Sequence, residues 1–259
     1  MAHDSVTVGH STHTGRVREA NQDAVVFYEP DEQDLLETIG RLIVIADGVG
    51  GHPGGDKAAQ TAVSRIQECY AESDGTDPPE SLRAAFVDAN RTIHEMGLRE
   101  KSLLGMGTTC TALVVRGKEA FLAHVGDSRA YFMRDGTIRQ LTKDHSAAWA
   151  LLEAGKITKE EYERHPKSRV IRRSLGYLAR VKVDLSRRAL AILPGDILLL
   201  CSDGLTGVVP DPEILSMATK YPPQEACEKL VARANMKGGP DNISVAIAQI
   251  NAVPEPSKE

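Results

Sequence analysis

The segment Leu42-Ile43-Val44-Ile45-Ala46-Asp47-Gly48-Val49-Gly50-Gly51-His52 carries an apolar run that stops abruptly at one carboxylate. The run from Leu42 to Ala46 is long enough for a buried strand, and the turn residues after it end that strand. The glycines after Asp47 let the backbone pass close to a bound group. The segment therefore predicts a central strand with Asp47 at the edge of a pocket.

Three other apolar segments also place an aspartate at a strand end. They are 121–126 before Asp127, 197–202 before Asp203, and 243–248 after Asp241. If these ends meet, the carboxylates would repel one another and would be costly to bury. A hard divalent cation, Mg²⁺ or Mn²⁺, would neutralise them through all-oxygen ligation. Each aspartate alone could simply cap a turn, but the set favours a metal site.

Composition limits the classes of protein to consider. The 259 residues could form one large domain or two small ones, and 41% apolar with 26% charged residues is typical of a soluble globular chain. A net charge of −5 without a basic stripe argues against nucleic acid as a partner, and no apolar stretch could span a bilayer. A polar N-terminus and four scattered cysteines fit reduced thiols in a cytoplasm.

The middle of the chain predicts a meander of antiparallel strands. These strands are expected at 106–115, 119–125 and 129–132, with turns at 116–118 and 127–128, and a fourth after Asp135-Gly136. Earlier strands are expected at 6–11 and 24–28, joined to the central strand by an acidic, solvated hairpin loop at 29–40. Later strands are expected at 181–190 and 196–201. This order argues against a doubly wound parallel sheet and favours antiparallel sheets with segregated helices.

Amphipathic spacing predicts helices at 54–72, 80–99, 210–219 and 224–235. The segment 142–176 is charged and helical in pattern, and it holds the only tryptophan, Trp149. Short helices are expected there at 147–154 and 159–164, with a further one at 168–175. We interpret the segment as a flap over the site, the simpler alternative being a plain helical insertion.

Other phosphate and hydrolase chemistries fit the sequence poorly. Cys110 to Arg116 matches the C-x₅-R pattern of cysteine phosphatases, but the residues between them have the composition of a buried strand. No Gly-Lys-Ser/Thr loop, G-x-S-x-G elbow or H-E-x-x-H helix is present. His124 lies on an expected strand, where a structural role is favoured.

Seven short motifs occur in order along the chain. They are Gly15-Arg16-Val17-Arg18 with Asn21-Gln22-Asp23, Ala46 to His52, Gly105-Met106-Gly107-Thr108-Thr109, His124 to Arg129, Leu141 to His145, Cys201 to Leu205, and Gly239-Pro240-Asp241-Asn242. Together they closely resemble the bacterial branch of the metal-dependent, type 2C serine/threonine protein phosphatases. The resemblance covers nearly the whole chain, from about Thr7 to Ile250.

The resemblance implies an α+β fold, a four-layer αββα sandwich of two antiparallel β-sheets flanked by helices, with a small helical flap. It implies a single catalytic domain over residues 1–250, with the flap at about 143–178. The polar residues 251–259 are expected to form a disordered tail.

The resemblance also implies a ligand set for two Mn²⁺ or Mg²⁺ ions. Asp47 matches the carboxylate that bridges both ions, and the carbonyl of Gly48 helps to hold one of them. Positions matching Asp203 and Asp241 hold the other ion, with Asp23 nearby. Asp127 matches a position that binds a third, weaker ion together with Asp203.

Arg18 matches the arginine that grips the substrate phosphate, and its spacing to Asn21-Gln22-Asp23 favours it over Arg16. A guanidinium fork suits two phosphate oxygens. The implied reaction is direct attack on phosphorus by a hydroxide that bridges the two ions. Val49 stands where eukaryotic members carry a histidine. The general acid is therefore unassigned among His52, His145, His165 and a metal-bound water.

The resemblance implies a phosphoprotein phosphatase that hydrolyses phosphoserine and phosphothreonine. Its implied partners are a cytoplasmic Ser/Thr kinase and the targets of that kinase, and a monomer is expected. Two alternatives stay open at this point. One is a catalytically weak relative that serves as a phosphoprotein-binding regulatory module, and the other is a small-molecule phosphatase.

Overall fold

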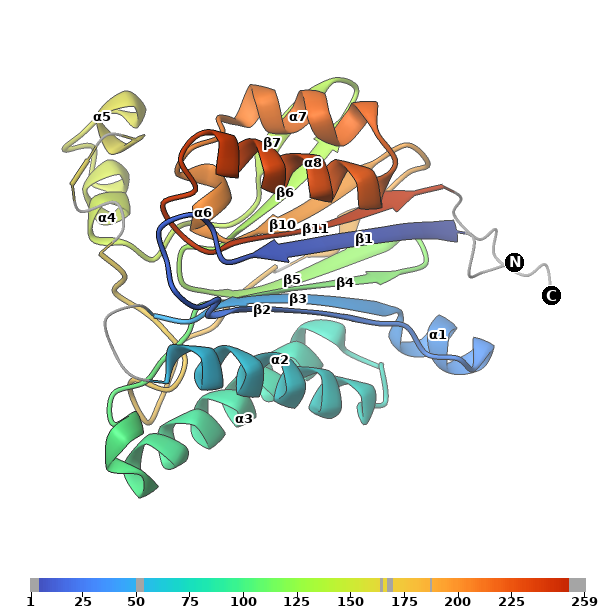
Figure 1. Cartoon of the computed structure of the whole chain (residues 1–259). Coiled ribbons are helices and arrows are strands. Elements are labelled where there is room, and N and C mark those ends of the chain that lie inside the picture. Colours follow the sequence, from blue (N-terminus) through green and yellow to red (C-terminus); the bar gives the residue numbers. More distant parts are fainter. Residues whose placement is uncertain (1–4, 50–53, 164, 167–169, 187, 252–259) are drawn as a thin grey trace.

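The computed structural model describes residues 5–49, 54–163, 165–166, 170–186 and 188–251. Two antiparallel sheets pack face to face, and helices cover both outer faces (Figure 1). The expected four-layer αββα sandwich is therefore confirmed. No helix in the described ranges is long and apolar enough to cross a bilayer.

The first sheet is built around a long C-terminal strand that pairs with the N-terminal strand along its whole length. In spatial order its strands are β1 (Val6–His13), β11 (Ile243–Ile250), β10 (Ile197–Cys201), β6 (Arg129–Arg134) and β7 (Thr137–Gln140). Its outer face is covered by α7 (Asp211–Lys220) and α8 (Pro223–Met236), and α6 (Asp203–Thr206) follows β10 directly.

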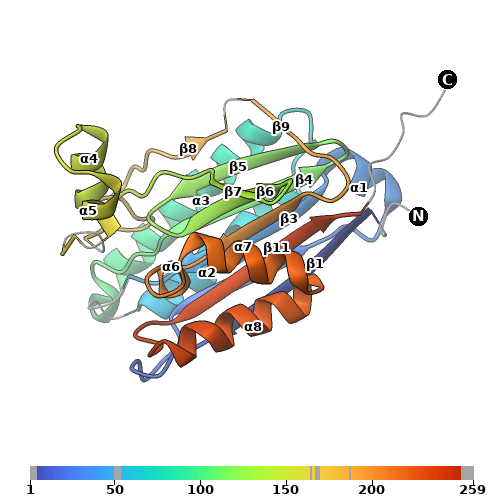
Figure 2. The same cartoon turned by 90° about the horizontal axis from the view of Figure 1, so that it is seen from above.

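The second sheet contains the strand that ends at Asp47. In spatial order its strands are β2 (Asp23–Tyr28), β3 (Arg41–Asp47), β4 (Cys110–Arg116), β5 (Glu119–Val125) and β8 (Asp184–Leu185), with β9 (Leu190–Ala191) also paired to β5. Its outer face is covered by α2 (Gly55–Ala71) and α3 (Pro78–Arg99). The flap helices α4 (Ala147–Glu153) and α5 (Lys159–Glu163) lie at one end of the sandwich (Figure 2).

The alternation of side chains along β3 explains why the whole strand is apolar. Val44 and Ala46 face the helix-covered core, whereas Ile43 and Ile45 face the core between the two sheets. A strand buried on both faces needs apolar residues at every position. The expected central strand is therefore present with its expected end at Asp47.

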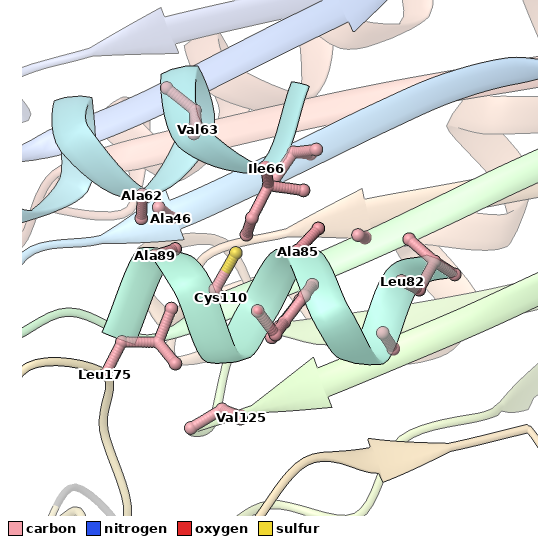
Figure 3. Packing of buried hydrophobic residues seen from close by; sticks show 14 of the residues in the cluster. Ala46, Ala62, Val63, Ile66, Leu82, Ala85, Ala89, Cys110, Val125 and Leu175 are labelled. Atoms are coloured by element: carbon pink, nitrogen blue, oxygen red, sulfur yellow. The ribbon is translucent and has the colours of Figure 1, made fainter. Parts of the chain in front are cut away.

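Cys110 lies in the core beneath α2 and α3, where Figure 3 shows its sulfur among apolar side chains. Burial raises the pKa of its thiol well above the ordinary value, so the thiolate is disfavoured. Cys110 and Arg116 are the two ends of the straight strand β4. The C-x₅-R match is therefore not a phosphate-binding loop.

Several expected elements differ from the structure. The acidic connection before β3 contains a helix, α1 (Gln33–Ile39), because Leu36 and Ile39 are buried beneath the acidic surface. The strand expected from Met106 begins only at Cys110, and residues 170–175 are not helical. The strand expected at 181–190 is reduced to the short pairings of β8 and β9. Of the expected tail, Asn251 donates its N–H to the Ser5 carbonyl (2.8 Å), and the remainder lies outside the described residues.

The expected hairpin between β5 and β6 is wrong. These two strands belong to different sheets, and Asp127 and Ser128 carry the chain from one sheet to the other. Strand composition cannot distinguish a turn within a sheet from a crossing between sheets. The hairpin expected at Asp135-Gly136 is confirmed, since β6 pairs with β7.

Candidate metal centre

The pairing of β2 with β3 brings two aspartates together. Asp23 opens β2, Asp47 closes β3, and the two are direct partners across the ladder. The peptide of Asp47 is held by the residues just before β4, because its N–H donates to Thr109 Oγ1 (3.1 Å) and its carbonyl accepts from the Thr109 N–H (2.8 Å). Thr108 Oγ1 donates to the same carbonyl (2.9 Å). The strand end that carries Asp47 is therefore fixed from the neighbouring strand.

Gly48 is required by a close approach of three backbone segments. A Cβ at this position would lie 2.3 Å from the Gly55 carbonyl oxygen and 2.8 Å from that of Gln22. The Gly48 N–H also donates to the Gln22 carbonyl (3.1 Å). This contact keeps the Gly48 backbone beside Asp47. The next residues of the loop, including the candidate acid His52, lie outside the described residues.

The other sheet supplies Asp203 and Asp241 from adjacent antiparallel strands. Asp203 follows the end of β10 as the first residue of α6, and Asp241 precedes the start of β11. A Cβ at Gly204 would lie 1.9 Å from the Asn242 carbonyl oxygen. Glycine at this position therefore allows the start of α6 to pack directly against the chain that enters β11.

A serine joins the carboxylate of Asp23 to the backbone of the other sheet. Ser202 Oγ donates to Asp23 Oδ2 (2.8 Å) and accepts from the Ser244 N–H (2.9 Å). Asp23 belongs to one sheet, and Ser244 belongs to the other. Sequence reasoning did not single out Ser202, although it stands directly before Asp203, because its role depends on contact between the sheets.

The pairing of Asp23 with Asp47 and the hydrogen bond from Ser202, the neighbour of Asp203, bring the carboxylates close together, and this proximity affects their pKa values. Burial raises the pKa of Asp23 to about 7, and nearby Asp203 and Asp241 add to the rise, while hydrogen bonds from Ser244 and Ser202 oppose it. Loss of solvent, followed by repulsion from Asp23 and the other aspartates, raises the pKa of Asp47 well above its ordinary value. Such mutual repulsion requires short distances in a weakly solvated site.

Asp127 joins the same group from the crossing between the sheets. Burial raises the pKa of Asp127, and Asp203 and Asp144 raise it further against the opposing charge of Arg129. The structure therefore brings together all five aspartates that the sequence singled out, although Asp127 lies in a crossover and not in a hairpin turn.

Two buried oxygens in this group have no hydrogen-bond donor among the described residues, namely Asp23 Oδ1 and Asp127 Oδ1. A bound cation can satisfy a buried carboxylate oxygen that has no donor and lies beside other carboxylates. Within the described ranges, no group of three or more His, Cys, Asp and Glu side chains is placed so that these side chains alone could hold a metal ion. Ions that also take carbonyl and water ligands, as Mg²⁺ and Mn²⁺ do, fit this open oxygen-rich arrangement.

Arg18 reaches this group from the loop between β1 and β2. Its Nη2 donates to Asp241 Oδ2 (2.8 Å), and its side chain is 45% exposed. The hydrogen bond and charge of Asp241 raise the pKa of Arg18, with smaller contributions from Asp203 and Asp47. The competing candidate Arg16 is held by its backbone, where its N–H donates to the Gly239 carbonyl (2.8 Å). Arg18 is therefore the arginine beside the carboxylates.

Asn242 fixes the loop that carries Arg18, a role that sequence reasoning did not identify. Its Nδ2 donates to the carbonyls of Thr14 (2.8 Å) and Ala20 (2.9 Å), and its Oδ1 accepts from the Gln22 N–H (2.8 Å). Asn242 is 5% exposed. The available signal was the Asp241-Asn242 dipeptide, but its contacts span more than two hundred residues of sequence.

The contacts of His145, one of the candidate general acids, indicate a structural role. Its Nδ1 accepts from the Gly126 N–H (2.9 Å), and its Nε2 lies 3.1 Å from Asp184 Oδ2 and 2.9 Å from Arg173 Nη1. Burial lowers the pKa of His145 despite Asp184, which favours the neutral ring. The other candidate, His165, follows α5 in the flap, where its N–H donates to the Tyr162 carbonyl (3.0 Å).

A cavity of about 990 Å³ lies beside Asp127 and Asp203, and α4 and α5 contribute Trp149, Leu152 and Tyr162 to its wall. At its edge the Arg129 guanidinium donates to both oxygens of Asp144, at 3.0 and 2.7 Å. The Tyr162 hydroxyl also donates to Asp144. This network ties α5 to the chain beside Asp127, so the expected flap borders the carboxylate group.

Comparison with known proteins gives one consistent result. The protein phosphatase 2C family matches residues 12–244. A serine/threonine phosphatase, stp, of Listeria welshimeri is 36% identical over 246 residues, which cover 93% of this chain and 94% of the relative. The crystal structure of the Mycobacterium tuberculosis serine/threonine phosphatase PstP/Ppp has a TM-score of 0.85 at 34% identity and covers 95% of this chain and 99% of that one.

A second solved structure bears on the carboxylates. It is the catalytic domain of PstP in complex with 2 manganese ions, with a TM-score of 0.80 at 34% identity, covering 95% of this chain and 98% of that chain. The relatives are named as phosphatases, which supports the enzyme over the phosphoprotein-binding alternative. The chain therefore belongs to the protein phosphatase 2C family and is a serine/threonine phosphatase.

Proposed function

We propose that the five aspartates hold the divalent ions with which this chain hydrolyses phosphoserine and phosphothreonine in proteins. The observation that carries the proposal is the convergence of carboxylates from both sheets, with buried oxygens of Asp23 and Asp127 left without donors among the described residues. When bound, the ions would supply activated water and offset the charge of the phosphate. Mn²⁺ is our first choice, because the PstP relative was solved with it.

The assignment of each residue follows its place in the fold. Asp47 would contact both core ions, because it faces Asp23 within its own sheet and Asp203 and Asp241 from the other. The carbonyl of Gly48 would complete the coordination of one ion. Asp127 with Asp203 would hold a third ion that is bound more weakly. Arg18 would orient the phosphate with a guanidinium that is already held beside Asp241.

The substrate peptide would lie in the cavity beside Asp127 and Asp203. Its wall includes Trp149 and Leu152 from α4 and Lys159 from α5. A peptide bound there would bring a phosphorylated side chain toward the carboxylates and Arg18. The flap would then contribute to the choice of substrate.

The wider setting is also a proposal. A phosphatase of this family opposes a Ser/Thr kinase, so the partners would be that kinase and its phosphorylated targets. All four cysteines are free thiols, which supports a reducing compartment such as the cytoplasm. One chain supplies the carboxylates from both sheets, which supports a single domain over residues 1–250 acting as a monomer.

The test is phosphate release from a phosphothreonine peptide and from p-nitrophenyl phosphate, with EDTA and after Mn²⁺ or Mg²⁺ is restored. We expect activity to vanish with EDTA, to return with Mn²⁺ and to be absent from Asp47→Ala. Activity that survives exhaustive chelation, or an Asp47→Ala variant as active as wild type, would refute the metal assignment. Turnover of phosphorylated metabolites but of no phosphopeptide would instead indicate a small-molecule phosphatase.

A further inference from the structure

A second cavity, of about 380 Å³, opens between the two sheets at the edge where β5 and β7 contribute to its wall. Its walls include Leu122 and Phe121 from β5, Arg139 from β7, and Leu141. None of the five aspartates lines it. The volume is within the range of sites that bind small organic molecules.

The cavity exists because the edge of the second sheet is interrupted. The strands β8 and β9 pair with opposite ends of β5, and between them Ser186 bonds to the middle of β5. There the Ser186 N–H donates to the Leu122 carbonyl (2.8 Å), and Ser186 Oγ accepts from the Leu122 N–H (3.0 Å). Leu122, Leu141 and Leu190 pack against the core between the sheets but are only partly buried. The apolar layer is therefore left open to solvent at this edge.

The charges around the opening are mainly positive. Lys143 is paired with Glu153 (2.6 Å), and Asp184 with Arg173 (2.7 Å). Arg139 and Arg188 are exposed, and no carboxylate among the described residues lies within ion-pair distance of either. The Arg139 guanidinium lies over the Phe132 ring, 5.8 Å from its centroid, which restrains it beside the opening.

We propose that this cavity binds an organic anion that has an apolar body and a single carboxylate or sulfonate. The apolar body would occupy the space between Leu122, Leu141 and Leu190, where it would cover surface that the chain leaves wet. The anionic group would lie at the opening, where Arg139 and Arg188 present guanidinium donors that suit its oxygens. A neutral molecule of the same shape would gain the burial of its apolar body and lack the interaction with the two guanidinium groups.

The site is separate from the carboxylate group. His124 forms part of the cavity wall, and its ring stacks on that of His145, with centroids 4.8 Å apart. His145 in turn holds Gly126 through its Nδ1 and its N–H. Asp127 does not line this cavity, and the proposal does not depend on the metal assignment.

The test uses the full chain and two fluorescent probes that share one apolar body. 1-Anilinonaphthalene-8-sulfonate carries a sulfonate, and N-phenyl-1-naphthylamine carries none. We expect the sulfonate probe to bind one equivalent, about tenfold more tightly than the neutral probe. Reversing both cations in Arg139→Glu with Arg188→Glu should remove that tenfold preference, which corresponds to about 1.4 kcal/mol and is within what two exposed charge pairs supply together. Leu122→Trp should fill the cavity and weaken binding of both probes.

Two controls keep the test specific. Arg99→Glu and Leu104→Trp alter an exposed arginine and leucine elsewhere and should bind both probes as wild type does. Phosphatase activity and thermal melting of every variant report that it is folded. Binding of the sulfonate probe that is unchanged in the Arg139/Arg188 and Leu122 variants would overturn the proposal. Equal affinity of wild type for the two probes would overturn it as well.

Discussion

Asp23 is buried against Ser202 while it faces Asp203 and Asp241, and its pKa of about 7 reflects this conflict. A carboxyl whose pKa is raised on folding stabilises the fold below the unfolded pKa, near 4. That stability is lost as pH rises through 7. In the absence of metal, ionised Asp23 therefore destabilises the protein at pH 8.

We therefore expect Asp23→Asn to raise the melting temperature in EDTA at pH 8, with a gain of about 1–3 kcal/mol in the free energy of unfolding. At pH 5 Asp23 of the folded wild type already carries a proton, so the difference in stability between Asp23→Asn and wild type should shrink. Asp88→Asn is the matched control. Burial raises the pKa of Asp88, but hydrogen bonds from Arg65 and Arg91 outweigh it and lower that pKa, so this change should destabilise at pH 8. Equal melting temperatures of Asp23→Asn and wild type at pH 8 would contradict the argument.

Arg18 permits a second prediction at this scale. Arg18→Ala should raise the KM for p-nitrophenyl phosphate by roughly tenfold or more, with a smaller fall in kcat, because a charge-assisted hydrogen bond contributes about 1.5–3 kcal/mol. Arg18→Lys keeps the positive charge but loses the forked guanidinium, so its KM should lie between those of wild type and Arg18→Ala. Arg16→Ala should resemble wild type in steady-state kinetics. A KM for Arg18→Ala equal to that of wild type would remove Arg18 from its assigned role.

Four of the five carboxylates were predictable because each stands at the end of an apolar run, a pattern visible in the sequence, whereas Asp23 was implied only by the family resemblance. The partners that orient them were not. Ser202 and Asn242 act through hydrogen bonds to residues 179 and about 220 positions away, and polar residues of these types also occur in ordinary turns. His124 and His145 likewise became assignable only when their ring partners were known.

At the scale of elements, the loop between β1 and β2 depends on one side chain at the start of β11. Asn242→Ala would remove three hydrogen bonds to that loop, which we expect to cost about 2–4 kcal/mol of stability at roughly 1 kcal/mol each. Because the loop carries Arg18, the KM for phosphate monoesters should also rise. Asn251→Ala, at the opposite end of β11, is the control for urea unfolding and kinetics. Unchanged KM and unfolding midpoint in Asn242→Ala would contradict this role.

The flap depends on the contact of Tyr162 with Asp144 and Arg129. Tyr162→Phe should loosen α5 and raise the KM for a phosphopeptide severalfold, whereas the KM for p-nitrophenyl phosphate should not change, because a small ester does not need the flap cavity. Tyr177→Phe changes an exposed tyrosine and serves as the control. An equal rise in KM for both substrates would show that Tyr162 acts on the reaction centre and not on peptide binding.

Helices and strands with clear periodicity were predicted close to their observed bounds, as for α2, α3 and β3. The errors have physical causes. The helix α1 was missed because its acidic surface obscured Leu36 and Ile39, which are buried. The crossing at Asp127 looked like a hairpin because three residues, Gly126 to Ser128, join two largely buried strands, and the membership of β5 and β6 in different sheets is decided by packing.

For the whole molecule, α6, which begins with Asp203, lies at the same end of the sandwich as the flap helices (Figures 1 and 2), and Asp47 lies at the end of β3 close to Asp203. Ions bound there would join both sheets and stabilise the folded state by mass action. The separate cavity between β5 and β7 lies at the edge of the same inter-sheet core. The sandwich thus combines a charged site at one end with an open apolar edge.

The most direct test of the metal centre is anomalous diffraction at the manganese edge from crystals grown with Mn²⁺. We predict two strong peaks for manganese ions that are both bound by Asp47, one of which is also bound by Asp203 and Asp241. A weaker third peak is expected beside Asp127. The same crystals of Asp47→Asn should lose at least one core peak. Strong manganese peaks elsewhere on the chain, with none at Asp47, Asp203 or Asp241, would contradict the account.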